Sequence, residues 1–119
     1  MKKVSELTGA DLDYWVAKAH GYDAVIEDGW CMTIHCSELS GWESHKSYFR
    51  PHEDWTACGQ IIERERIQLW DLGDEWMAKA GMKAGSFGCD KCPRISALRA
   101  YVSSKYGDSV PAGAQEASQ

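Results

Sequence analysis

The segment from residue 48 to residue 66 carries the densest set of side chains that could bind a ligand. It reads YFRPHEDWTACGQIIERER. Aromatic rings stack on nucleobases, a guanidinium group holds an anion, and a carboxylate accepts hydrogen bonds from a base edge. The pattern therefore predicts a binding site for a small anionic, nucleotide-like ligand. The candidate ligand-binding residues are Tyr48, Arg50, His52, Asp54, Trp55, Arg64 and Arg66.

A plainer interpretation of the same segment stays open. Trp55 and Tyr48 would anchor it in the core, and Asp54 would cap a turn. The run Glu63–Arg66 also has two interpretations. As a strand, it would place both carboxylates on one face and both guanidinium groups on the other, which suits an edge that meets a partner. Otherwise it is a solvated face held by salt bridges.

The cysteines give a weak metal signal. Cys89 and Cys92 have the spacing of a C-x-x-C motif, and Cys31, His35, Cys36 and Cys58 could supply further ligands. A structural zinc site usually needs a second C-x-x-C or a paired histidine motif, and the chain has neither. We therefore expect no metal and no cofactor, with Cys89 and Cys92 as the weak candidates. Without an export signal, we expect the thiols to be reduced.

The sequence favours a binding protein over an enzyme. It contains no phosphate loop, nucleophile elbow or metal triad. Cys58 and His52 are the cysteine–histidine pair closest in sequence, but nearness along the chain does not supply catalytic geometry. We therefore predict no catalytic residues.

Composition excludes several partners. The chain has 119 residues, a net charge of −5 and no basic run, so duplex nucleic acid is not expected. No apolar stretch is long enough to span a membrane, and the N-terminus does not have the pattern of a signal peptide. The length suits one domain, and we expect most of the six tryptophans in or beside its core.

Two helices are expected, over residues 8–20 and 93–106. Thr8 can cap the first and Gly21 can end it, while Pro93 suits the first position of the second. In the second helix, the apolar stripe leaves Arg99 on the other face.

The strands are expected to be short. Residues 22–27 and 30–35 flank Asp28-Gly29 and predict a hairpin. Residues 67–70 predict a further strand. Residues 75–80 fit a strand or a helix, and their alternation favours the strand, while 36–47 and 81–92 have the composition of loops. The fold class is α+β, with two main helices packed on a short, irregular, mostly antiparallel sheet. We expect one domain over residues 1–108 and a disordered tail over 109–119.

Three blocks of sequence are similar to a known family. They are VSELTGADLDYWVAKA at Val4–Ala19, PHEDWTACGQIIERE at Pro51–Glu65 and ALRAYVSSKYGD at Ala97–Asp108. With these blocks the chain resembles the NinX family, a group of small tailed-phage accessory proteins of unknown function. The resemblance implies a phage origin, the cytoplasm of the infected bacterial host, and an accessory role outside the virion.

The chain departs from the usual family pattern in the middle block. The family has P-S-T-D-W followed by G-G-P. Here His52 and Glu53 replace the small hydroxyl residues, and Cys58-Gly59-Gln60 replaces G-G-P. The departures imply a central segment that differs in ligand or in rigidity.

Two functions remain as expectations. The first is a non-enzymatic, homo-oligomeric binder of a small nucleotide-like ligand, by analogy with small phage proteins that sequester the signalling nucleotides of host defence. The alternative is a protein–protein module that docks on a host enzyme, because tryptophan, tyrosine and arginine dominate interface hot spots.

Overall fold

The computed structural model describes residues 2–37, 43–81 and 86–111, without the side chains of 35–37 and 43–45. Its helices are η1 (Val4–Glu6), α1 (Gly9–Ala19), α2 (Trp55–Glu65) and α3 (Pro93–Tyr106). Its strands are β1 (Lys2–Lys3), β2 (Asp23–Glu27), β3 (Trp30–Ser37), β4 (Glu43–Tyr48), β5 (Gln68–Asp71), β6 (Trp76–Lys79), β7 (Phe87–Asp90) and β8 (Ser109–Val110). The expected α+β class is confirmed.

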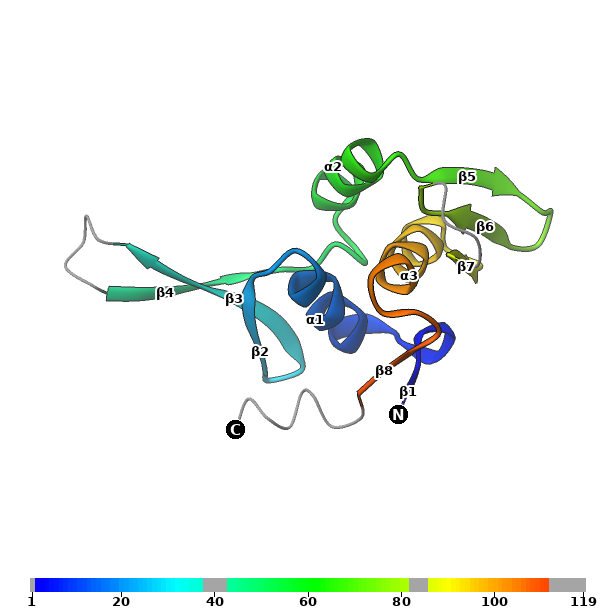
Figure 1. Cartoon of the computed structure of the whole chain (residues 1–119). Coiled ribbons are helices and arrows are strands. Elements are labelled where there is room, and N and C mark those ends of the chain that lie inside the picture. The colour runs from blue at the N-terminus through cyan, green and yellow to red at the C-terminus, as the bar shows by residue number, and fades with distance from the viewer. Residues whose placement is uncertain (1, 38–42, 82–85, 112–119) are drawn as a thin grey trace.

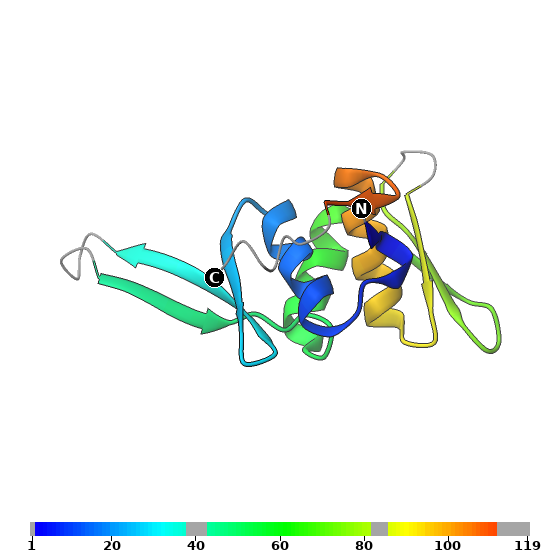
Figure 2. The same cartoon turned by 90° about the horizontal axis from the view of Figure 1, so that it is seen from below.

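Three antiparallel sheets surround the helices (Figure 1). Sheet β2–β3–β4 packs beside α1, and sheet β5–β6–β7 covers α3 on the other side of the molecule (Figure 2). The ribbon of β1 and β8 brings the two ends of the described chain together. Helices α1, α2 and α3 lie between the two larger sheets, so the core forms around the helices.

Local signals set the first hairpin and the last helix. Asp28 and Gly29 both have positive φ, 53° and 80°, which is the backbone of a tight hairpin turn. They join β2 to β3 in the expected register, with Glu27 opposite Trp30. Helix α3 begins at Pro93, as predicted. Thr8 occupies the N-cap position of α1 but makes no side-chain hydrogen bond there. In the first turn of the same helix, Oδ2 of Asp11 lies 3.3 Å from Nζ of Lys2.

Several expected boundaries are wrong. Helix α2 occupies most of the segment that had no assigned structure, so Glu63–Glu65 is helical and does not form a strand. Residues 36–47, expected as a loop, contain the end of β3 and most of β4. Residues 81–92 contain β7. Ser109–Val110, expected in the tail, pair with β1, and the tail beyond residue 111 lies outside the described residues.

The core is formed by α1, α3 and the segments packed on them. Leu7, Leu12, Val16, Leu98 and Val102 are all fully buried. Burial of each such side chain stabilises the fold by about 1.5–3 kcal/mol. This apolar cluster fixes the positions of α1 and α3.

Two expectations about the interior are corrected. Arg99, expected off the apolar face, is 7% exposed and hydrogen-bonded within the core. Of the tryptophans, Trp15 is buried and Trp76 is half-buried, but Trp30, Trp55 and Trp70 are 36%, 49% and 36% exposed. Trp42 lies outside the described residues. The molecule therefore displays large aromatic surfaces that the core does not use.

Candidate ligand-binding pocket

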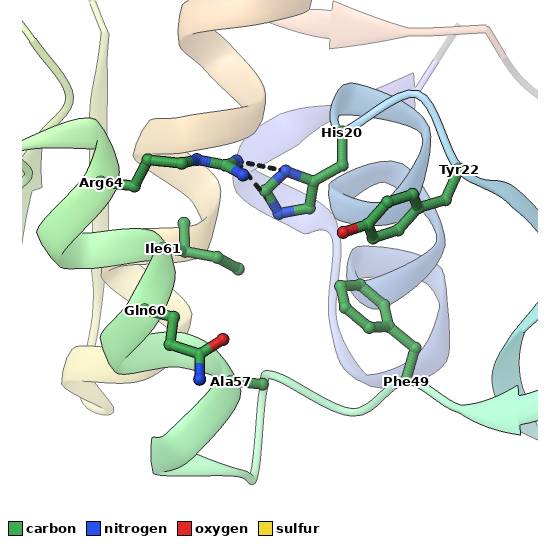
Figure 3. Close-up of a pocket in the computed structure, with 7 residues that line it drawn as sticks. All are labelled: His20, Tyr22, Phe49, Ala57, Gln60, Ile61 and Arg64. Atoms are coloured by element: carbon green, nitrogen blue, oxygen red, sulfur yellow. Dashed lines mark hydrogen bonds between the residues drawn. The ribbon is translucent and has the colours of Figure 1, made fainter.

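A pocket of about 210 Å³ opens between the C-terminal end of α1 and one face of α2 (Figure 3). Its lining combines three aromatic rings, one amide, two aliphatic side chains and one guanidinium group. The lining residues are His20, Tyr22, Phe49, Ala57, Gln60, Ile61 and Arg64.

A turn after α1 and a backbone hydrogen bond after β4 bring the aromatic rings to the pocket. His20 is the C-cap of α1, and Gly21, with φ 84°, reverses the chain so that Tyr22 stands next to it. Phe49 follows β4 directly and is held by its backbone N–H, which donates to the carbonyl of Cys31 across 3.0 Å. These local constraints fix the wall opposite α2.

Helix α2 supplies the other wall. Ala57, Gln60, Ile61 and Arg64 follow the i, i+3, i+4, i+7 spacing, so they share one face of the helix. The side chain of Asp54 accepts a hydrogen bond from the backbone N–H of Thr56 at 2.9 Å and caps the first turn. The helix therefore begins at a defined residue and presents this face as a unit.

Arg64 is held in place before any ligand arrives. Its Nε donates to Oε2 of Glu65 at 2.8 Å, and its Nη2 donates to Nδ1 of His20. The same Nη2 lies 3.4 Å from the hydroxyl of Tyr101, which is 3.0 Å from His20 Nδ1. A guanidinium group fixed in this way loses little conformational entropy when it binds an anion.

The charge state of the histidine follows from its surroundings. Burial, and then the nearby Arg64 guanidinium, lower the pKa of His20 to about 4. The imidazole is therefore neutral at pH 7, and its Nδ1 can accept the hydrogen bond from Arg64. Burial also raises the pKa of Tyr101, so its phenol stays protonated.

The three rings form an open aromatic corner. His20 and Tyr22 have centroids 5.3 Å apart and planes tilted by 39°. Phe49 stands nearly perpendicular to both, at 6.3 Å from His20 and 6.1 Å from Tyr22. Such a corner offers faces and edges to a flat ligand.

Of the seven candidate residues, the structure places Arg64 alone in this pocket. Tyr48 and Arg50 lie elsewhere, in a cluster with Trp30. The Arg50 guanidinium stands 5.1 Å from the ring centroid of Trp30 and 5.2 Å from that of Tyr48. Tyr48 is 61% exposed, so it does not anchor the segment in the core.

The other four candidates have separate environments. His52 contacts buried Asp13, Asp54 caps α2, and Trp55 lies under the guanidinium of Arg94 at 5.0 Å. Arg66 is the left-handed C-cap of α2, with φ 53°, and is exposed. The predicted single groove is thus divided into distinct clusters.

The pocket also contains residues that the sequence did not single out. His20 and Tyr22 carried no signal, because nothing in their spacing indicates that the chain turns back toward α2. Phe49 and Gln60 lie inside the predicted segment. Recognition of residues 55–65 as a helix would have grouped Gln60 with Arg64 on one face.

The cysteines do not gather around a common point in the described chain. Among the described residues, no three His, Cys, Asp or Glu side chains are placed to hold a metal ion. Cys89 Sγ lies 3.5 Å from Oε2 of Glu75, and Cys92 is the N-cap of α3. Burial raises the pKa of Cys31 and of Cys58 to about 12, so neither thiol ionises at neutral pH. The side chain of Cys36 lies outside the described residues.

Comparison with known proteins decides the family. The family model described as Bacteriophage P22, NinX matches residues 3–105, nearly the whole chain. The chain belongs to the NinX family. The earlier resemblance, drawn from three blocks of sequence, is confirmed. A search of curated proteins gives no match.

One NinX block supplies one wall of the pocket. Pro51–Glu65 contains α2 and its capping turn, with the lining residues Ala57, Gln60, Ile61 and Arg64, whereas the aromatic wall of His20, Tyr22 and Phe49 lies outside the three blocks. Of the departures from the family pattern, Gln60 lines the pocket and Cys58 is buried on the core side of α2. No helix in the described part of the chain is both long and apolar enough to cross a bilayer.

Proposed function

We propose that this NinX protein is a non-enzymatic binder of a small, anionic, nucleotide-like ligand. The observation that carries the proposal is the position of Arg64. It is the one formally charged side chain among the seven that line the pocket, and it is oriented by Glu65 and His20. A fixed guanidinium beside aromatic rings suits a phosphate attached to a flat ring system.

The dimensions narrow the ligand class. The volume of about 210 Å³ lies below the range of roughly 300–1,000 Å³ that encloses drug-sized ligands. It therefore suits one base or nucleoside better than a dinucleotide. The side chain of Arg64 is 54% exposed, so a phosphate would bind at the mouth of the pocket. Gln60 offers an amide donor and acceptor to a base edge.

Membership of a phage family supports a role in an infected bacterium. We propose that the protein acts in the host cytoplasm and withdraws a nucleotide that the host uses as a defence signal. Sequestration needs no catalytic group. The imidazole beside Arg64, that of His20, accepts a hydrogen bond from the guanidinium group at Nδ1, and its lowered pKa makes it a weak base.

Thermal-shift measurements with mono-, di- and cyclic nucleotides and ADP-ribose test the proposal. At a ligand concentration 100-fold above Kd, binding adds about 2.7 kcal/mol of stability. We expect a mononucleotide to raise Tm in the wild type and in Arg66→Ala, the matched control at the end of the same helix, but not in Arg64→Ala. No shift with any ligand, or equal shifts in both variants, would exclude this site.

A second candidate function rests on a different cluster. Trp30, Tyr48 and Arg50 form an exposed aromatic–guanidinium cluster at the base of the β3–β4 hairpin, and Arg50 also contacts Glu53 at 3.4 Å. These residue types dominate protein-interface hot spots. We propose this cluster as the docking surface if the protein acts on a host enzyme. Capture of one host protein that is lost in Tyr48→Ala and kept in Arg64→Ala would support docking.

A further inference from the structure

Sheet β5–β6–β7 has one face against α3 and one face turned away from it. Ala78 and Gly88, at the centres of β6 and β7, are buried against α3. The strand alternation therefore turns Met77 and Cys89 to the opposite, outer face. Within the described ranges, no helix or strand packs on that outer face (Figures 1 and 2).

The outer face is apolar along its central row. Trp70, Met77 and Cys89 are directly paired across the three strands. Phe87 stands two residue pairs further along, on the same face as Cys89, and is 46% exposed, and Trp70 is 36% exposed. Large apolar side chains gathered on an uncovered sheet face mark an interaction surface.

Opposite charges stand on the two sides of this row. On β6, Lys79 lies two residues after Met77, and its Nζ is 5.8 Å from the ring centroid of Phe87. Glu75 lies two residues before Met77, and its Oε2 is 3.5 Å from Sγ of Cys89. Both contacts place these charges on the outer face. From Glu75, just before β6, to Lys79 at its end, the order on this face is therefore acid, apolar, base.

We propose that this outer face binds the same face of a second copy of the chain. In this dimer the β5–β6–β7 sheets of the two copies lie face to face, and the two-fold axis runs between them. The axis is perpendicular to β6 and passes over Met77, so it places the central row of one copy on the central row of the other. It places Glu75 of each copy opposite Lys79 of the other. Isologous dimers need such self-complementary surfaces, and the symmetric charge order selects a second copy over an unrelated partner.

The size of the face sets the strength of the dimer. Three four-residue strands cover roughly 13 Å by 14 Å at ordinary strand rise and spacing. That is smaller than the face of about 800 Å² that each partner buries in a standard interface. The dimer is therefore weak and forms only at high protein concentration.

Exchange of the charges at Glu75 and Lys79 tests this geometry. Sedimentation velocity at the high protein concentrations that are usual in NMR measures whether each variant is a monomer or a dimer. Lys79→Glu and Glu75→Lys each place like charges opposite one another, so each variant alone should be monomeric. A one-to-one mixture should form a heterodimer, because every opposed pair is then of opposite sign. The double variant E75K/K79E should dimerise like the wild type. Circular dichroism confirms that each variant is folded.

Two outcomes would overturn the proposal: a wild type that stays monomeric throughout the concentration range, or folded single variants that dimerise as well as the wild type. Each disagrees directly with the pairing of Glu75 and Lys79. Recovery of the dimer in the mixture is the result that an alternative surface would not produce.

Cross-linking at Cys89 gives a second readout. This residue lies in the row over which the axis passes, so the two copies of Cys89 face each other across sheets about 10 Å apart. That separation is too long for a disulfide but suits a short bis-maleimide. In a Cys36→Ser, Cys92→Ser background, we expect a cross-linked dimer that Lys79→Glu abolishes. Equal cross-linking in both proteins would contradict the axis.

Discussion

His52 and Asp13 join the turn before α2 to the middle of α1. The backbone N–H of His52 donates to Oδ1 of Asp13 across 3.0 Å, and its Nδ1 contacts Oδ2 of the same carboxylate. Nε of Arg94 donates to the carbonyl of His52 across 2.9 Å. These bonds fix the turn between Phe49 and α2, and therefore the width of the pocket.

The buried carboxylate makes stability depend on pH. Asp13 is fully buried, and this burial raises its pKa from 3.8 to about 6, although its contacts with His52 act in the opposite direction. In the window between about pH 4 and pH 6 the folded state binds more protons at this site than the unfolded state. The contribution of Asp13 to stability is therefore lost as pH rises through 6.

The first prediction concerns Asp13→Asn, which keeps the shape of the side chain and removes its titration. As pH falls from 7 to 4, we expect the wild type to gain up to about 3 kcal/mol relative to this variant, from roughly 1.4 kcal/mol per pKa unit. Urea unfolding at several pH values measures the difference. Asp23→Asn, at the exposed start of β2, is the control and should follow the wild type. Parallel curves for Asp13→Asn and the wild type would show that Asp13 does not titrate in this range.

The second prediction concerns His20, whose effect has the opposite sign. Its pKa is lowered from 6.5 to about 4 by burial and by Arg64, so the unfolded state binds more protons between these values. Its contribution to stability is present above pH 6.5 and is lost as pH falls through 4.

In the wild type the effects of His20 and Asp13 offset each other over nearly the same range of pH. In His20→Asn the slope due to Asp13 remains, so stability should fall as pH rises from 4 to 6. In Asp13→Asn the slope due to His20 remains, so stability should rise. Tm measured across this range tests both signs. Slopes of the same sign in the two variants would contradict the assignment.

The third prediction concerns a close approach between β7 and α3. A Cβ on Gly88 would stand 2.1 Å from the carbonyl oxygen of Ser96 and 2.6 Å from the backbone nitrogen of Ala100. Because backbone atoms cannot yield as a flexible side chain can, Gly88→Ala should destabilise the fold by about 1–3 kcal/mol or more. Chemical denaturation measures this loss.

The matched control for Gly88→Ala is Gly59→Ala in α2. A Cβ on Gly59 meets nothing within 4 Å, and its backbone is helical. Alanine there should stabilise the protein by about 0.5–1 kcal/mol, because it reduces the entropy of the unfolded chain. Similar effects of the two substitutions would show that β7 lies farther from α3 than the structure places it.

The elements that the sequence predicted correctly have local causes. Asp28-Gly29 sets the first hairpin, and Pro93 starts α3. Helix α2 was missed because Pro51 and the alternating charges obscured its apolar face, although Asp54 is an ordinary N-cap residue. The pocket could not be predicted in the same way. It brings together His20 and Arg64, 44 residues apart, through the packing of α1 against the rest of the core.

The last prediction concerns Arg99, whose guanidinium group is buried beside three segments of the chain. Its Nε and Nη2 donate to the carbonyl of Leu7 at 3.1 and 3.0 Å. Its Nη1 donates to the carbonyl of Cys89 at 2.8 Å and lies 3.2 Å from Asp90. One side chain therefore joins the N-terminal segment and β7 to α3.

Arg99→Met should destabilise the fold by about 3–5 kcal/mol, because it removes the hydrogen bonds and leaves Asp90 without its cation. Arg99→Lys keeps the charge but cannot reach both carbonyls at once, so we expect an intermediate loss. Arg66→Met, at an exposed cap of α2, is the control and should change the free energy of unfolding by less than about 0.5 kcal/mol. If the Arg99 guanidinium group joins these segments, urea denaturation should show the largest loss of stability in Arg99→Met, an intermediate loss in Arg99→Lys and the smallest in Arg66→Met. A lysine variant as stable as the wild type would show that charge alone suffices there.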